Sequence, residues 1–122
     1  MKLSREFTFD AAHSLDHYPA GHANTRVHGH SFRARVTVEG MPDANGQIVD
    51  LEEMGRQLHE IRNKLDHQML NDIDGLEQPT LENLCLFIWD NLQNGLPQIS
   101  AVEVFRDSLG QSCLYQGSQH VH

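Results

Sequence analysis

The strongest constraint on the fold of this chain is a regular alternation of side chains between residues 28 and 39. The apolar positions are Phe32, Ala34, Val36 and Val38. The polar positions between and after them are Arg33, Arg35, Thr37 and Glu39. Because successive side chains of a β-strand point to opposite faces, this pattern predicts a strand over residues 30–40 with one face in the core.

Two histidines continue the core-facing row of this strand. His28 and His30 lie on one face, and Gly29 between them lets the backbone bend or approach a ligand closely. Neutral imidazole is a common metal ligand, so two rings aimed together suit a metal ion. Another strand-like run, residues 7–13, ends in His13 and offers a third ligand. The alternative is that one or more of these are hydrogen-bonded core histidines, but the three together favour a metal site.

The composition limits the number of domains and the kinds of partner. A chain of 122 residues is long enough for one domain, residues 1–122, and too short for two. The net charge is -8 and the nine Lys and Arg residues are scattered, which argues against nucleic acid or an anionic membrane as partner. No apolar run is long enough to cross a bilayer, and the N-terminus lacks the apolar core of a signal peptide. We therefore expect a cytoplasmic protein.

The two cysteines and the last two histidines receive no chemical role. Cys85 falls in an apolar helical pattern and Cys113 in a short strand-like run, as expected of reduced core residues. His120 and His122 are expected to belong to a frayed tail.

The expected elements follow the order strand, strand, helix, helix, strand, strand. Strands are expected over residues 3–12, 30–40, 99–107 and 112–116, with a short return strand at residues 47–49. Residues 14–27 have no sustained period and are expected to form a loop over the metal site. The order predicts an α+β fold with both helices on one face of an antiparallel sheet.

Capping signals and apolar stripes define the two helices. The first begins at Asp50 as N-cap, with Glu53 as its reciprocal partner. Its apolar stripe comprises Leu51, Met54, Leu58, Ile61 and Leu65. The second helix opens at Pro79 and Thr80, and Gly95 and Pro97 stop it.

Short motifs along nearly the whole chain resemble the 6-pyruvoyltetrahydropterin synthase family, and most closely its bacterial 6-carboxytetrahydropterin synthase branch. The motifs, in chain order, are Phe9-Asp10-Ala11-Ala12-His13, Gly21-His22, His28-Gly29-His30-Ser31-Phe32, Val49-Asp50-Leu51, Leu65-Asp66-His67, Leu70-Asn71-Asp72, Pro79-Thr80-x-Glu82 and Trp89. The resemblance implies a tunnelling fold of ββααββ subunits, assembled as a homohexamer (a dimer of trimers) with active sites at subunit interfaces.

The resemblance also implies a chemistry. It implies zinc on His13, His28 and His30, which would hold the side-chain hydroxyls of 7,8-dihydroneopterin triphosphate and act as a Lewis acid. Asp66 and His67 match the family's acid–base pair. Taken alone, they would indicate a helix-end histidine beside a solvated aspartate. Thr80 and its neighbours match the loop that meets the pterin ring, and Thr80 can also be a plain helix N-cap.

Two positions depart from the family pattern. The family's catalytic cysteine stands four residues before the first histidine of the H-G-H motif, where this chain has Asn24. An amide can neither take a proton nor attack at neutral pH. The family's pterin-anchoring glutamate matches Arg106, with charge of the wrong sign. A one-residue slip would offer Asp107, but a slip turns a side chain to the opposite sheet face unless a bulge restores it.

Three functions follow from these matches and departures. The first is a zinc lyase acting on a dihydropterin, with His67 or a metal-bound water in place of the thiol. The second is a related enzyme with another substrate, non-pterin or anionic, which Arg106 would favour. The third is a zinc-binding partner subunit without catalysis. Pterin binding separates the first from the second, and turnover separates both from the third.

Overall fold

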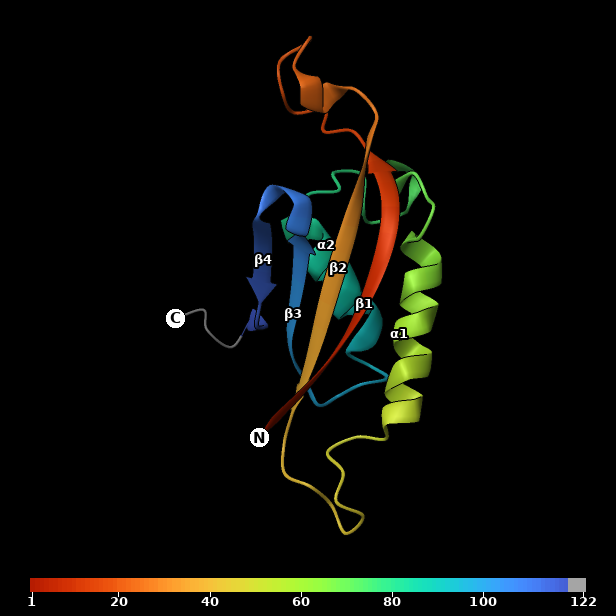
Figure 1. Cartoon of the computed structure of the whole chain (residues 1–122), viewed down its shortest axis with the longest axis vertical. Helices are drawn as coiled ribbons and strands as arrows, with labels where there is room; N and C mark the ends of the chain where they lie inside the picture. Colours follow the sequence, from red (N-terminus) through yellow and green to blue (C-terminus); the bar gives the residue numbers. More distant parts are fainter. Residues whose placement is uncertain (119–122) are drawn as a thin grey trace.

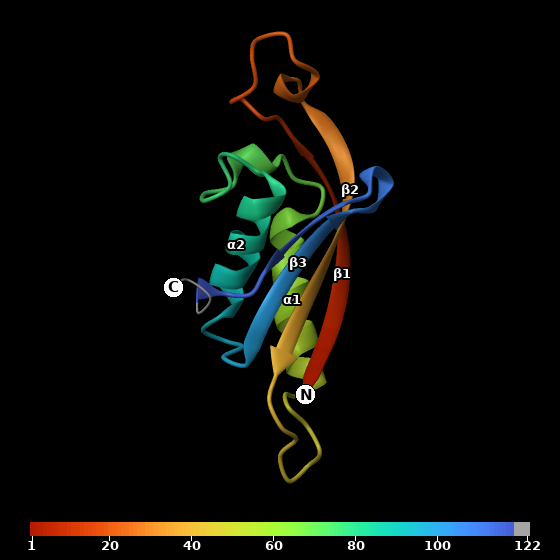
Figure 2. The same cartoon turned by 90° about the vertical axis from the view of Figure 1, so that its left-hand side faces the viewer.

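The computed structural model describes residues 1–118 and consists of a four-stranded antiparallel sheet and two helices. The strands follow the order of the chain: β1 (Lys2–His13), β2 (His28–Glu39), β3 (Ile99–Arg106) and β4 (Gln111–Tyr115) (Figure 1). The two helices, α1 (Leu51–Leu65) and α2 (Leu81–Leu92), cover one face of the sheet (Figure 2). The predicted α+β arrangement is confirmed.

The core lies between the sheet and the helices, and β2 contributes the row of apolar residues that its alternation predicts. Ala34, Val36 and Val38 have no exposed surface. Phe32 stacks on Phe9 of the neighbouring strand with ring centroids 4.9 Å apart. The β1–β2 register places His13 opposite His28 and continues to the far end of both strands, so the core row ends in histidines.

Both helices begin at the predicted caps. The Asp50 side chain accepts a hydrogen bond from the Glu52 N–H at 3.0 Å, and Thr80 Oγ1 accepts from the Asn83 N–H at 3.1 Å. Four of the five stripe residues of α1 are buried, but Leu51 is 43% exposed. Glu53 does not complete a reciprocal cap, because its carboxylate pairs with Arg56 one turn along the helix.

The predicted return strand at residues 47–49 is wrong. β2 already pairs with β1 on one side and β3 on the other, so it has no free edge for a third strand. The segment instead follows a turn closed by Asp43, whose carboxylate accepts from the Asn45 and Gln47 N–H groups. Residues 14–27 form the expected loop, with one short 3-10 helix at Ala23–Thr25, beyond the end of the sheet (Figure 1). His120 and His122 lie outside the described residues.

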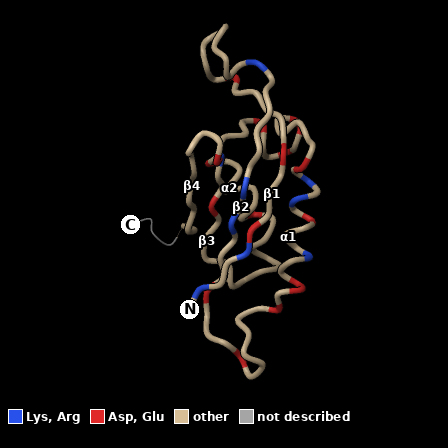
Figure 3. The backbone as a smooth tube through the Cα atoms, viewed as in Figure 1, with Lys and Arg blue, Asp and Glu red and all other residues tan. Residues whose placement is uncertain are grey.

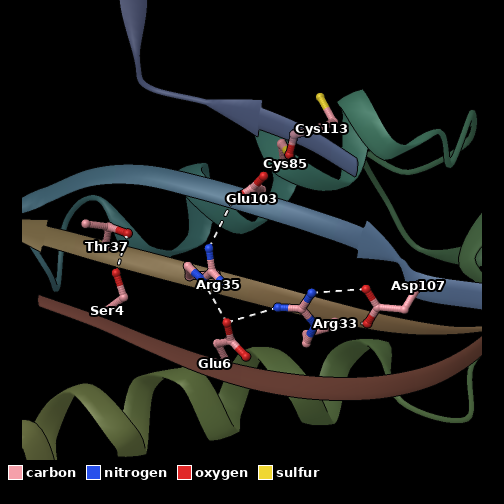
Figure 4. A network of polar contacts seen from close by, with 9 residues as sticks. All are labelled: Ser4, Glu6, Arg33, Arg35, Thr37, Cys85, Glu103, Asp107 and Cys113. Carbon is pink, nitrogen blue, oxygen red and sulfur yellow. Dashed lines mark hydrogen bonds and ion pairs between the residues drawn. The ribbon is translucent and has the colours of Figure 1, made fainter. Parts of the chain in front are cut away.

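The sheet face opposite the helices carries an ion-pair network (Figure 4). Arg33 donates to Glu6 at 3.0 Å and to both carboxylate oxygens of Asp107 at 2.9 and 3.0 Å. Arg35 shares Glu6 at 2.7 Å. These side chains are partly exposed, so each pair adds little stability, but the network sets the direction of Asp107.

Positions of Lys and Arg and positions of Asp and Glu are interspersed along the described backbone (Figure 3). Within residues 1–118, no helix combines the length and apolar character needed to cross a membrane.

Candidate metal centre and adjoining clefts

The three histidines converge at the end of β1 and β2, next to the loop of residues 14–27. One ring nitrogen of each of His13, His28 and His30 lies within 4.8 Å of those of the other two. His13 is 1% exposed, and the other two are half-buried. The paired strands bring them together because His13 and His28 are direct cross-strand partners and His30 is next in the core-facing row.

Backbone carbonyls determine which ring nitrogens are free. His13 Nδ1 donates to the Pro79 carbonyl at 3.0 Å, and His28 Nδ1 donates to the Arg26 carbonyl at 2.7 Å. A neutral imidazole carries one proton, so Nε2 of both rings is a bare acceptor, and these two atoms face each other at 3.0 Å. His30 Nε2 is buried and has no partner within residues 1–118. Converging lone pairs without a donor fit a bound cation.

Burial keeps the His13 and His30 imidazoles neutral. Desolvation lowers the pKa of His13 to about 4, and nearby His28, His30 and Arg106 lower it further, while the Pro79 carbonyl opposes the shift. Desolvation also lowers the pKa of His30, followed by the charge of Arg106. Neutral imidazole is the form that ligates metals. The site therefore offers three nitrogen ligands, and backbone carbonyls fix the orientation of two of the rings.

The Asp66–His67 pair forms at the C-terminal end of α1, tied to β1. Asp66 accepts from the Asp10 N–H at 2.9 Å with one oxygen and from His67 Nδ1 at 2.8 Å with the other, and Arg62 lies 3.2 Å away. The Asp10 N–H and then His67 lower the pKa of Asp66, so the carboxylate is charged. It holds the imidazole with Nδ1 protonated and leaves Nε2 free to exchange a proton.

The backbone of His67 is held in an unusual conformation. Its φ is 59°, in the left-handed region that non-glycine residues rarely adopt. The Asp10 carbonyl accepts from its N–H at 2.7 Å, and its side chain is 78% exposed. Strained backbone held by surrounding contacts is common at functional sites, and here it presents an accessible imidazole.

Two clefts adjoin His30. One, of about 570 Å³, includes His67, and its lining residues are Asp10, Ala11, Ala12, Gly29, His30, Ser31, His67, Gln68 and Met69. The other, of about 590 Å³, is lined by Leu15, Tyr18, Ala23, Asn24, Arg26, Val27, His28, His30, Arg106, Leu109 and Gln111. Within one chain, Asn24 and His67 thus lie in different clefts.

The structure distinguishes Arg106 from Asp107. Arg106 ends β3 on the helix-facing side and reaches the second cleft, whereas Asp107 pairs with Arg33 on the opposite face (Figure 4). Thr80 caps α2, and its neighbour Pro79 supplies the carbonyl that orients His13. The substrate-binding roles of these residues stay predictions.

Two supporting residues were not assigned roles from the sequence. Asn71 accepts from the Ser14 N–H at 2.9 Å and donates to the Ser14 carbonyl at 2.8 Å, which fixes the backbone directly after His13. Asp10 accepts from Ser31 Oγ at 2.6 Å and meets His67 through its backbone. Both belong to motifs noted in the sequence, but their partners are distant along the chain.

Comparison with known proteins identifies the family. The 6-pyruvoyl tetrahydropterin synthase family model matches residues 2–118. The chain belongs to this family. It is 38% identical over 109 residues to a 6-carboxy-5,6,7,8-tetrahydropterin synthase of Synechocystis, covering 84% of this chain and 83% of that one. It is 32% identical over 111 residues to human 6-pyruvoyl tetrahydrobiopterin synthase, covering 79% and 77%.

The structural comparison agrees with the family's fold. The Caenorhabditis elegans 6-pyruvoyl tetrahydropterin synthase superposes with a TM-score of 0.86 at 21% identity, covering 97% of this chain and 96% of that one. The tunnelling fold expected from the sequence is thereby confirmed.

Proposed function

We propose that this protein is a zinc-dependent lyase of the pterin synthase family that acts on 7,8-dihydroneopterin triphosphate or a related dihydropterin. The observation that carries the proposal is the convergence of His13 and His28 Nε2 at 3.0 Å beside the unpartnered His30 Nε2. Three imidazoles with room for a further ligand are typical of catalytic zinc sites.

In this proposal, zinc supplies Lewis acidity that favours negative charge on a substrate oxygen. Asp66 orients His67, whose free Nε2 accepts and returns a proton. Asn24 provides a hydrogen-bonding amide but no base. The direct test is to incubate zinc-loaded protein with 7,8-dihydroneopterin triphosphate and separate the pterins by chromatography. Loss of substrate that requires His67 supports the proposal, even where it is slow. No conversion by the unsubstituted protein or by the double variant Asn24→Cys, Arg106→Glu contradicts it.

A second function keeps the metal centre but changes the substrate. Arg106 favours it, because the guanidinium in the second cleft donates hydrogen bonds and accepts none. A zinc-binding subunit without catalysis is the third possibility, and turnover of any substrate excludes it.

We expect one zinc ion per chain, bound through His13, His28 and His30. Metal analysis should find this ratio in protein whose last four residues are removed, so that tail histidines do not contribute. The double variant His28→Ala, His30→Ala should lose the metal, because one imidazole cannot hold zinc in competition with water. His59→Ala, on the exposed side of α1, is the matched control. Equal zinc in all three proteins would contradict the site.

We expect a hexamer, or at least a trimer, with sites shared between chains. β1 and β4 are the two edges of the sheet, and exposed edges are commonly covered by neighbouring subunits. A shared site could also join the cleft of His67 in one chain to that of Asn24 in another. Light scattering at micromolar concentration that gives only the 13.9 kDa chain would refute this expectation.

A further inference from the structure

Arg106 differs from the paired arginines of the sheet. Arg33 and Arg35 each pair with a carboxylate on the sheet's open face. Arg106 reaches the second cleft beside His28 and His30, and within residues 1–118 no carboxylate lies at ion-pair distance from it. Its Nε is buried and makes no hydrogen bond to the described residues.

A buried guanidinium N–H without an acceptor is energetically unfavourable, so a ligand that supplies a hydrogen-bond acceptor to Arg106 Nε would be stabilised here. Burial lowers the pKa of Arg106, and the negative charge of Glu82 opposes the shift. The guanidinium nevertheless remains positively charged, since arginine is not deprotonated in proteins. The Nε–H and an adjacent Nη–H form the fork that binds two oxygens of a carboxylate or phosphate.

The rest of the cleft is consistent with a small anionic molecule. Arg26 is a second cation on the lining, and Asn24 adds an amide. Leu15, Tyr18 and Leu109 give apolar and aromatic surface, and the volume of about 590 Å³ is within the range of small-molecule sites. Two cations in one cleft of a chain with net charge -8 concentrate positive potential there.

We propose that Arg106 selects a substrate that presents an oxyanion, a carboxylate or a phosphate, to the cleft beside the histidine triad. This inference rests on the proposed function for the metal centre beside the cleft. It specifies the substrate chemistry of the second function proposed above, in which an anionic group takes the place of the pterin's donor edge. A guanidine-like ring edge, which presents N–H donors, would face the donors of Arg106 and is disfavoured. The oxyanion satisfies the buried Nε–H and neutralises the guanidinium.

The test is calorimetric titration of the full-length, zinc-loaded protein with three ring compounds of similar size. Benzoate carries a carboxylate, phenyl phosphate a phosphate, and benzamide is the neutral counterpart of benzoate. We expect one of the two anions, or both, to bind at least tenfold more tightly than benzamide. Arg106→Gln should weaken anion binding by about 10–100-fold, as for loss of charged hydrogen bonds, and Arg106→Lys should restore only part of it, because lysine lacks the fork.

Arg56→Gln is the matched control, since it removes the same charge from the exposed side of α1 and should leave binding unchanged. Circular dichroism shows whether the Arg106 variants are folded. If Arg106→Gln is not folded, the anion affinity of Arg106→Lys is compared with that of the unsubstituted protein instead. Equal binding of benzamide and the anions, binding of none of the three, or full anion binding by a folded Arg106→Gln would overturn the proposal. Zinc is measured in the same samples, and the titrations are repeated without metal. If the protein binds no zinc but binds anions through Arg106, the result contradicts the proposed function alone. If it binds zinc but no anion, the result contradicts this inference alone.

Discussion

The double variant Asn24→Cys, Arg106→Glu is expected to convert 7,8-dihydroneopterin triphosphate far faster than either single variant. The unsubstituted protein should convert it very slowly or not at all, because general acid–base assistance is typically worth about 10²–10⁴-fold and Asn24 provides none. Asn24→Cys alone should do little while Arg106 repels the donor edge of the pterin. The increase in the double variant should reach about 10²–10⁴-fold and exceed the combined single effects.

The structure makes this pair a suitable test. Both side chains line the same cleft with His28 and His30, so one change can supply the reactive group while the other admits the ring. The backbone contacts of Asn24, to the Leu15 N–H and to His22 Nδ1, are retained in Asn24→Cys. Asn24→Ser with Arg106→Glu is the control, since it has a similar size without a thiolate.

The measurement is the initial rate of substrate loss, with zinc determined in every variant. High turnover by the unsubstituted protein would contradict the need for a thiol and leave His67 as a sufficient base. A double variant that binds zinc but does not react would contradict the dihydropterin assignment and favour another substrate.

Acidification of the metal-free protein is expected to cost about 3 kcal/mol of stability through His13 alone. Its pKa lies at about 4 in the folded chain, against 6.5 for a histidine exposed to water. Between these values the unfolded chain binds a proton that the folded chain does not, so the free energy of unfolding falls as pH decreases. The loss begins near pH 6.5 and is complete below about pH 4, and 2.5 pH units correspond to about 3 kcal/mol.

Urea unfolding at a series of pH values measures this effect. His13→Gln removes the titrating ring and should flatten the difference between pH 7 and pH 4 by about 3 kcal/mol relative to the unsubstituted protein. His59→Gln, at an exposed position of α1, controls for the general loss of a histidine. Identical pH profiles for His13→Gln and the unsubstituted protein would show that burial of His13 does not penalise its charged form.

Local periodicity determined the elements that carry the site. Alternation along β2 predicted a strand whose core face ends in His28 and His30, because side chains of a strand alternate regardless of distant contacts. The stripe of α1 and the caps Asp50 and Thr80 were equally predictable, since they depend on neighbours within one turn. The motif spacing was sufficient to identify the family and its fold.

Only the tertiary structure decided what depends on partners far along the chain. Residues 47–49 form no strand, because β2 pairs with β1 along one edge and with β3 along the other. The tertiary structure placed the Arg106 side chain in a cleft and paired Asp107 with Arg33. Which of these two adjacent residues faces the cleft depends on where β3 ends. It also placed the Pro79 carbonyl on His13, across 66 residues, which leaves Nε2 free. The sequence contains every one of these groups, but which donor meets which acceptor is settled only when the sheet and helices pack.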